Sequence, residues 1–193
     1  LELRFHQGRH EALLVRPDMR LDLGAIAKGY ALDEAATVLR RHGIRSFLLS
    51  GGGDMIVGEA SPGEAGWKVE AGVFDDPQSP TRRTLVLANT ALATSGDSFQ
   101  RAEIGGIRYS HIVDPRTGVG LTDHSLVTVI ASSAMLADAL STTVSVMGPE
   151  AGLELANRRG AEVWILRKPG TVLEETRTPG FPQGQTPSVA PSN

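Results

Sequence analysis

The sequence predicts an α+β fold in which a mixed β-sheet packs against helices. Strand-like and helix-like segments interleave along the 193 residues, and several neighbouring strands are spaced like hairpins. Glycine is plentiful, with 22 residues, whereas aromatic residues make up only 5% of the chain. Tight turns are therefore expected to shape the fold more than aromatic packing does. An α/β arrangement fits the same pattern, and the sequence contains no internal repeat.

Local periodicity places the individual elements. Ala31, Leu32 and Ala35 fall at helical spacing and Gly43 is a suitable stop, so a helix is expected within residues 21–43. β-branched runs and alternation indicate strands. The other elements are expected to be helices at residues 133–148 and 149–160 and strands at residues 12–16, 46–54, 67–74, 83–89, 107–113, 125–131 and 161–166.

The length suits one domain, which we expect to span residues 1–170. Residues 171–193 are expected to form a disordered C-terminal tail, because residues 178–193 are rich in Pro, Gly, Ser and Gln and lack periodicity. The chain starts at Leu1 rather than Met, and strand-like sequence follows directly. We therefore interpret it as a fragment or a processed form.

Composition excludes several classes of function. The formal charge of −3 argues against a general nucleic-acid surface, which needs clustered Lys and Arg. The absence of cysteine excludes disulfides, thiolate nucleophiles and Cys-type zinc sites, and leaves the compartment open. No run approaches the ~18 apolar residues of a membrane span, and no signal peptide is visible.

The segment LDLGAIAKGYALD, residues 21–33, is a candidate anion site because a loop or strand gives way to a helix there. A helix N-terminus offers unpaired N–H groups and a partial positive charge, to which Lys28 adds a full charge. Small residues near Asp22 and Lys28 would let a phosphate or a flavin ribose approach the backbone. The alternative is purely structural: Asp22 caps the helix and the glycines turn the chain.

Two further segments are ambiguous by themselves. SGGGDM, residues 50–55, fits either a phosphate-binding loop or a tight turn. In YSHIVDPRTG, residues 109–118, His111 is a candidate general base because its ordinary pKa lies near neutrality. A lone His in a strand is also a common structural residue, and Asp114 and Arg116 could simply pair within a turn.

The segment ADALSTT, residues 137–143, contains a candidate Mg²⁺ site. Asp138 and Thr142 are four residues apart and therefore share one face of the expected helix. A carboxylate and a hydroxyl are hard oxygen ligands that suit Mg²⁺. The alternative is that the Thr hydroxyl bonds to its own i−4 carbonyl. Asp138 needs a cation in either case, because a carboxylate among apolar neighbours is unfavourable unless it is paired.

Taken in order, five segments resemble the ApbE family of FAD:protein FMN transferases. They are DLGAIAKGYALD, GGGD after a strand, ATSGD, YSHIVDPRTG and ADALSTT, and the resemblance runs from about residue 20 to about residue 166. It implies an ApbE-like flavin transferase fold. It also implies an enzyme that binds FAD and Mg²⁺, transfers FMN to a Thr or Ser hydroxyl of an acceptor protein and releases AMP.

The resemblance assigns roles to individual residues. It implies that Asp138, Thr142 and the backbone carbonyl of Ala25 hold the metal. It implies that Asp22 and Lys28 bind the flavin substrate, and that His111 contacts it and serves as the base for the acceptor hydroxyl. Charge on pyrophosphate oxygens must be neutralised during cleavage, which Mg²⁺ and Lys28 would do without a covalent enzyme nucleophile. Asp114 and the turn at residues 116–118 would hold the corner beside His111 and line the flavin pocket.

One departure from the family concerns length. Full-length members carry a further N-terminal part that contacts the flavin ring, so the chain is interpreted as N-terminally truncated. Two alternatives stay open: a FAD pyrophosphatase that gives free FMN and AMP, and a non-catalytic flavin-binding remnant. The resemblance further implies a periplasmic or membrane-attached extracytoplasmic location and an acceptor that could be membrane-associated.

Overall fold

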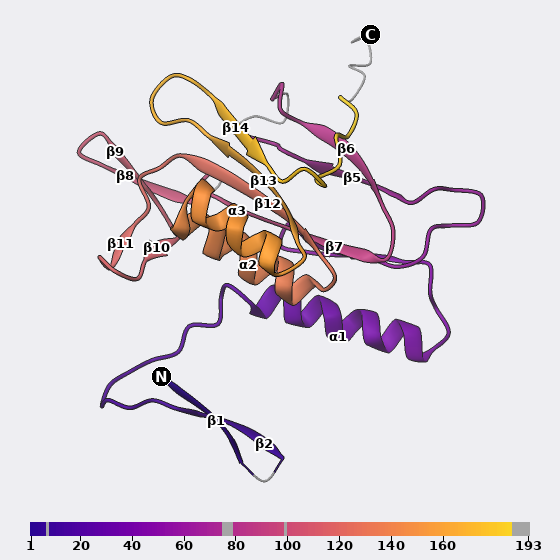
Figure 1. The fold of residues 1–193 in the computed structure, drawn as a ribbon, viewed down its shortest axis with the longest axis horizontal. Coiled ribbons are helices and arrows are strands. Elements are labelled where there is room, and N and C mark those ends of the chain that lie inside the picture. Colours follow the sequence, from indigo (N-terminus) through magenta and orange to yellow (C-terminus); the bar gives the residue numbers. More distant parts are fainter. Residues whose placement is uncertain (7, 75–78, 99, 187–193) are drawn as a thin grey trace.

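The computed structural model describes residues 1–6, 8–74, 79–98 and 100–186, and these form a central β-sheet with helices packed on one face (Figure 1). The predicted α+β class is confirmed. In the described part of the chain the main sheet has six strands in the order β14-β13-β12-β7-β4-β3. All of its pairings are antiparallel, which refines the expected mixed sheet. Its strands are β3 (Leu48–Gly51), β4 (Asp54–Val57), β7 (Thr90–Gly96), β12 (Ser125–Ala131), β13 (Glu162–Arg167) and β14 (Glu174–Arg177).

The helical layer contains α1 (Ala27–Arg41), α2 (Ala134–Met147) and α3 (Pro149–Arg158). Helix α2 packs on β7 and β12 and is flanked by α1 and α3. The first helix begins at Ala27 because residues 24–26 form a turn whose backbone bonds return to Leu23. Of the helices that the structure describes, none is long and apolar enough to cross a membrane.

Strand β12 lies at the centre of the fold, and all of its residues are buried. Val127 and Val129 belong to the apolar cluster beneath the helices. Leu126 belongs to a second cluster on the opposite face, which is covered by the hairpin of β5 (Trp67–Ala71) and β6 (Arg83–Leu87). Because successive side chains of a strand point to opposite faces, β12 needs apolar residues at nearly every position.

The expected tail at residues 171–193 is wrong over most of its length. Strand β14 pairs with β13 and extends the sheet. Beyond it, Phe181 is buried beside Trp164, with ring centroids 5.7 Å apart. The buried Phe181 and Thr178 and the bridge between Gln185 and Thr84 therefore hold a Pro- and Gly-rich segment whose composition suggested disorder. Residues 187–193 lie outside the described residues.

The N-terminal hairpin of β1 (Glu2–His6) and β2 (Arg9–Leu13) lies apart from the main sheet in Figure 1, and its described residues are exposed. The strand expected at residues 12–16 overlaps only the end of β2.

The strand expected at residues 107–113 is interrupted. Strand β9 (Ile107–Ser110) pairs with β8 (Arg101–Ile104), and the short β10 (Val113–Asp114) pairs with β11 (Val119–Gly120). The break between β9 and β10 contains His111, so this residue lies in a loop rather than within a strand.

Candidate active site

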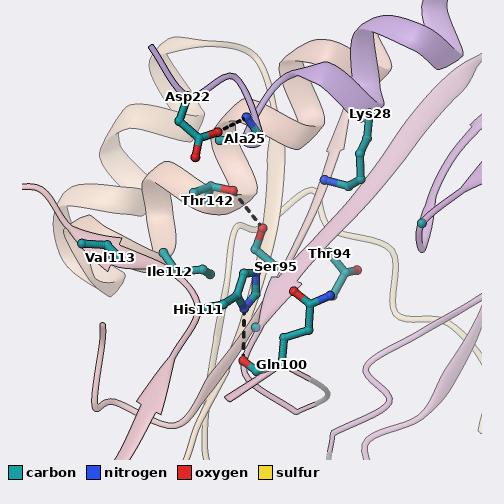
Figure 2. A pocket seen from close by; sticks show the side chains of 13 residues that line it. Asp22, Ala25, Lys28, Thr94, Ser95, Gln100, His111, Ile112, Val113 and Thr142 are labelled. Atoms are coloured by element: carbon teal, nitrogen blue, oxygen red, sulfur yellow. Dashed lines mark hydrogen bonds between the residues drawn. The ribbon is translucent and has the colours of Figure 1, made fainter. Parts of the chain in front are cut away.

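A cavity of about 650 Å³ forms where the loop before α1, the glycine turn after β3, the end of β7 and the loop between β9 and β10 meet α2 (Figure 2). Each of the five sequence segments contributes to its wall, although they are spread over more than 100 positions. The cavity is lined by Asp22, Gly24, Ala25, Lys28, Gly52, Thr94, Ser95, Gly96, Gln100, His111, Ile112, Val113 and Thr142.

Asp138 lies beneath this wall and is paired with a cation, as the sequence predicted. Its Oδ1 is 2.8 Å from Lys28 Nζ, and its Oδ2 accepts a hydrogen bond of 3.0 Å from the Gly29 backbone N–H. Lys28 Nζ is also 3.2 Å from Oδ2 of Asp54. We call these three side chains, Lys28, Asp54 and Asp138, the Lys28 cluster. It joins α1, β4 and α2.

The Lys28 cluster has two carboxylates and one ammonium. Both carboxyl side chains are only 1% exposed, whereas Lys28 is 42% exposed and reaches the cavity. Burial raises the pKa of Asp54; the positive charge of Lys28 opposes this rise and the negative charge of Asp138 adds to it. Burial acts to lower the pKa of Lys28, but the hydrogen bond to Asp138 and the two negative charges outweigh it and raise the pKa. Lys28 is therefore protonated at neutral pH.

Two glycines of the motifs allow this cluster to form. A Cβ on Gly29 would lie 2.2 Å from the Ala134 carbonyl oxygen, so only glycine lets α1 approach α2 this closely. Gly52 has a φ of 61° in the turn before Asp54, and a Cβ there would lie 3.0 Å from Lys28 Cδ. Gly29 thus lets α1 pack closely on α2, and Gly52 leaves space for the Lys28 side chain.

Thr142 faces the cavity from α2. Its Oγ1 is 3.1 Å from Ser95 Oγ, which is also 2.7 Å from Ser141 Oγ. The bond back to the i−4 carbonyl is made by the neighbouring Thr143, whose Oγ1 donates to Ala139 O at 2.7 Å. The structural alternative for Thr142 is therefore wrong, and its hydroxyl borders the cavity.

His111 projects into the cavity from the opposite side (Figure 2). Its Nδ1 is 3.1 Å from the backbone carbonyl oxygen of Gln100. A carbonyl oxygen can only accept, so Nδ1 must carry the proton in this contact. In the neutral ring, Nε2 then keeps its lone pair, which is the form that a general base needs.

Asp22 and Ala25 line the cavity where the chain enters α1. The suggested role of Asp22 as the helix cap is wrong, because the cap position is Ile26 and carries no side-chain cap bond. Asp22 Oδ1 instead accepts a hydrogen bond of 2.8 Å from the Gly24 backbone N–H. The loop is thereby folded so that Asp22 faces the cavity.

Asp114 and Arg116 are not among the residues that line the cavity. Asp114 pairs with the Arg116 guanidinium at 2.8 Å and also accepts the Arg116 backbone N–H at 2.8 Å. The Asp114 carbonyl accepts the Gly118 N–H, which closes the turn. We call residues 114–118 the Asp114 turn. It follows Val113 in the chain but does not line the cavity, so the expectation that it lines the pocket is wrong.

Comparison with known proteins identifies the relationship. The model of the ApbE family matches residues 2–165. The chain belongs to the ApbE family. The FAD:protein FMN transferase of Escherichia coli K12 is 33% identical to it over 171 residues, which is 86% of this chain and 47% of that protein. The enzyme of the same name from Rhodobacter capsulatus is 37% identical over 154 residues, which is 78% of this chain and 28% of that protein.

Solved ApbE structures have the same fold. The flavin transferase ApbE from Vibrio cholerae gives a TM-score of 0.78 at 29% identity, over 93% of this chain and 56% of that chain. The apo form of Pseudomonas stutzeri flavinyl transferase ApbE gives 0.71 at 33% identity, over 84% and 50%. The chain thus spans about half the length of the Escherichia coli relative and less of the one from Rhodobacter capsulatus.

Several residues at this ApbE site were missed at the level of sequence. Asp54 and Ser95 lie within GGGD and ATSGD, but neither was assigned a role. Gln100 lines the cavity, and nothing in the sequence indicated it. Asp97, also of ATSGD, is buried and lies 2.7 Å from His124 Nδ1 and 2.6 Å from Arg108 Nε. The available signal was an acid directly after glycine: Asp54 follows three glycines and Asp97 follows Gly96.

Proposed function

We propose that this chain carries the metal- and phosphate-binding half of a FAD:protein FMN transferase. The proposed reaction transfers FMN from FAD to a Thr or Ser hydroxyl of an acceptor protein, depends on Mg²⁺ and releases AMP. The observation that carries the proposal is the cavity, whose wall contains residues from all five ApbE-like segments. Family membership and the names of the relatives support the same reaction class.

The residues around Asp138 fit Mg²⁺. The two buried carboxylates of the Lys28 cluster face one ammonium, so the cluster keeps a net negative charge that favours a second cation. The ligands that the family resemblance implies are oxygens: the Asp138 carboxylate, the Thr142 hydroxyl and the Ala25 carbonyl. Thr142 and Ala25 line the cavity, and an oxygen set of this kind suits Mg²⁺. When bound, Mg²⁺ supplies neutralisation of charge on the pyrophosphate oxygens.

Three side chains of the cavity would bind the substrate and transfer the proton. The ammonium of Lys28 would attract phosphate oxygens, and Asp22 would bind the flavin substrate beside it. His111 Nε2 would accept the proton of the acceptor hydroxyl as its oxygen bonds to the FMN phosphorus. The bond from that phosphorus to the AMP oxygen breaks in the same displacement. Phosphoryl transfer needs mainly such positioning and electrostatic stabilisation.

The partner is accordingly a protein with an accessible Thr or Ser. We place the reaction outside the cytoplasm, in the periplasm or at its membrane face, with an acceptor that can be membrane-associated. This assignment rests on family resemblance.

The test is an assay of the purified chain with FAD and Mg²⁺, with and without an acceptor domain that bears a Thr. We expect AMP release together with acceptor-bound flavin that stays fluorescent after denaturation. Asp138→Ala should abolish both products, and His111→Ala should slow transfer by about 100-fold. Arg116→Ala, in the Asp114 turn, is the matched control and should transfer at the wild-type rate.

Other results would contradict the proposal in recognisable ways. AMP with only free FMN would identify a FAD pyrophosphatase. FAD binding without turnover would identify a non-catalytic flavin-binding protein. Equal rates for wild type and Asp138→Ala would remove the metal site from the mechanism.

A further inference from the structure

Asp54 is a buried carboxylate that the proposed reaction does not use. It begins β4 directly after the glycine turn, and its side chain is almost completely buried. Its Oδ1 accepts a long hydrogen bond of 3.3 Å from the Thr94 N–H. Among the described residues, its Oδ2 has no well-aligned hydrogen-bond donor, and its partner is the charge of Lys28, whose Nζ lies 3.2 Å away. Such a group is expensive to bury, so Lys28 is its main compensation.

Lys28 lies closer to the carboxylate of Asp138 than to that of Asp54 in this structure. Its ammonium is 2.8 Å from Asp138 Oδ1 with hydrogen-bond geometry, compared with 3.2 Å from Asp54. A divalent cation that binds Asp138 would therefore meet a positive charge already in place. Repulsion between two cations at such distances is strong in a partly buried site, so the ammonium has to move when the metal binds.

We propose that Asp54 is the counter-ion that receives Lys28 when a divalent cation takes Asp138. The inference rests on the proposed function, because it assumes the metal site at Asp138. The ammonium already lies between the two carboxylates, so a small shift keeps it paired throughout. The half-exposed Lys28 chain and the missing side chain at Gly52, next to Lys28 Cδ, leave room for this shift. Asp54 is thus a positioning residue that acts through Lys28.

The test measures binding of Mn²⁺ alone by electron paramagnetic resonance of the free ion. It compares the full chain with Asp54→Asn, Lys28→Met and the double variant. Without Asp54 the displaced ammonium loses its second partner, so Asp54→Asn should raise the Kd by about tenfold. In the Lys28→Met background no ammonium has to move, and Asp54→Asn should change the Kd by much less. A purely structural role of Asp54 would produce the same change in both backgrounds.

Asp33→Asn is the control for the loss of an aspartate that links α1 to α2 outside the Lys28 cluster. Asp33 extends from α1 to α2, where its carboxylate accepts the N–H groups of Ala134 and Met135 at 2.8 and 2.9 Å. This variant should lower the melting temperature and leave the Mn²⁺ Kd unchanged. Because Lys28→Met can prevent folding, a second measurement follows the ¹⁵Nζ resonance of Lys28 by NMR. On Mg²⁺ addition the ammonium should shift yet stay protected from exchange in wild type, and lose protection in Asp54→Asn.

Three results would overturn the proposed exchange of Lys28 from Asp138 to Asp54. They are no Mn²⁺ binding by wild type, an equal effect of Asp54→Asn in both backgrounds, or a Lys28 resonance that does not change when Mg²⁺ is added. Failure of the proposed function is distinguishable from these. Mn²⁺ binding with the expected dependence on Asp54, but without AMP release from FAD, would retain the exchange and reject the transferase.

Discussion

Asp54 and Asp114 each lie close to a positively charged side chain, in two different regions, and their pKa values shift in opposite directions. Asp54 is buried in the Lys28 cluster and shares one ammonium with Asp138, so burial raises its pKa despite Lys28. Asp114 lies near the surface in the Asp114 turn, where hydrogen bonds from Arg116 lower its pKa. Contact distance alone therefore does not say what an ion pair does. Burial and the number of carboxylates that share one positive side chain decide whether the pKa of the carboxyl group is raised or lowered.

The largest expected effect comes from removing the shared ammonium. Lys28→Met leaves two buried carboxylates without a cation, which should lower the free energy of unfolding by about 3 kcal/mol at neutral pH. A carboxyl group whose pKa is raised in the folded state favours folding while it is protonated, and this advantage is lost as the pH rises through the folded pKa. In the wild type, the positive charge of Lys28 limits the rise in the pKa of Asp54, so removing Lys28 should raise this pKa further. The deficit relative to wild type should be larger at pH 8 than at pH 5.

Urea unfolding at the two pH values measures this deficit. Lys28→Met/Asp54→Asn is the control, since it removes one of the uncompensated charges and should recover part of the lost stability. A deficit that is independent of pH would show that Lys28 stabilises the fold by packing of its methylene groups rather than by its charge.

The helix contact that supports the Lys28 cluster gives the next effect. A methyl group at Gly29 would meet backbone atoms of Ala134 and Met135 at 2.2 and 2.5 Å, and backbone cannot yield as a flexible side chain can. Overpacking of this kind costs up to about 3 kcal/mol, and alanine returns about 1 kcal/mol of helix propensity. Gly29→Ala should therefore lower stability by about 2 kcal/mol in urea unfolding. A stabilised variant would mean that α1 and α2 can separate freely.

The sequence predicted the buried parts of the fold well and the site in part. The β-branched run at residues 125–131 coincides with β12, because a strand covered on both faces needs a continuous apolar run. Helix α2 was equally clear from its period. The strand β14 and the anchor Phe181 were not predicted, because their stability comes from pairing with β13 and from the contact with Trp164, which the Pro- and Gly-rich composition of the segment does not show.

For the site, the motifs identified most of the cavity wall but not its charge balance. Lys28, His111 and Thr142 line the cavity, as the family resemblance implied. The sharing of Lys28 between Asp54 and Asp138 could not be predicted, since it depends on three elements that are brought together only by the tertiary fold. Sequence spacing likewise suggested that Asp114 and His111 act together, whereas only His111 lines the cavity.

Gly118→Ala tests the Asp114 turn in the way that Gly29→Ala tests the helix contact. Gly118 has a φ of 71°, but no described atom lies within 4 Å of the position that a Cβ would occupy. The cost is then backbone strain alone, about 1 kcal/mol, and should appear as a small decrease in melting temperature. Mn²⁺ binding should stay at the wild-type level, because the turn does not line the cavity. Weaker Mn²⁺ binding would show that the turn does help to position the site.

The smallest effect is expected for Arg116→Ala. The guanidinium is 73% exposed, and solvent screens exposed ion pairs so strongly that many contribute nothing measurable. Asp114 keeps the Arg116 backbone N–H, so the turn can still close without the Arg116 side chain. The melting temperature at pH 7 should therefore equal that of wild type. Because Arg116 lowers the pKa of Asp114 in the folded state, any difference should be present above about pH 4 and disappear as the pH falls further. A loss of stability close to that of Lys28→Met would mean that burial does not separate the two regions, and the comparison between Asp54 and Asp114 would fail.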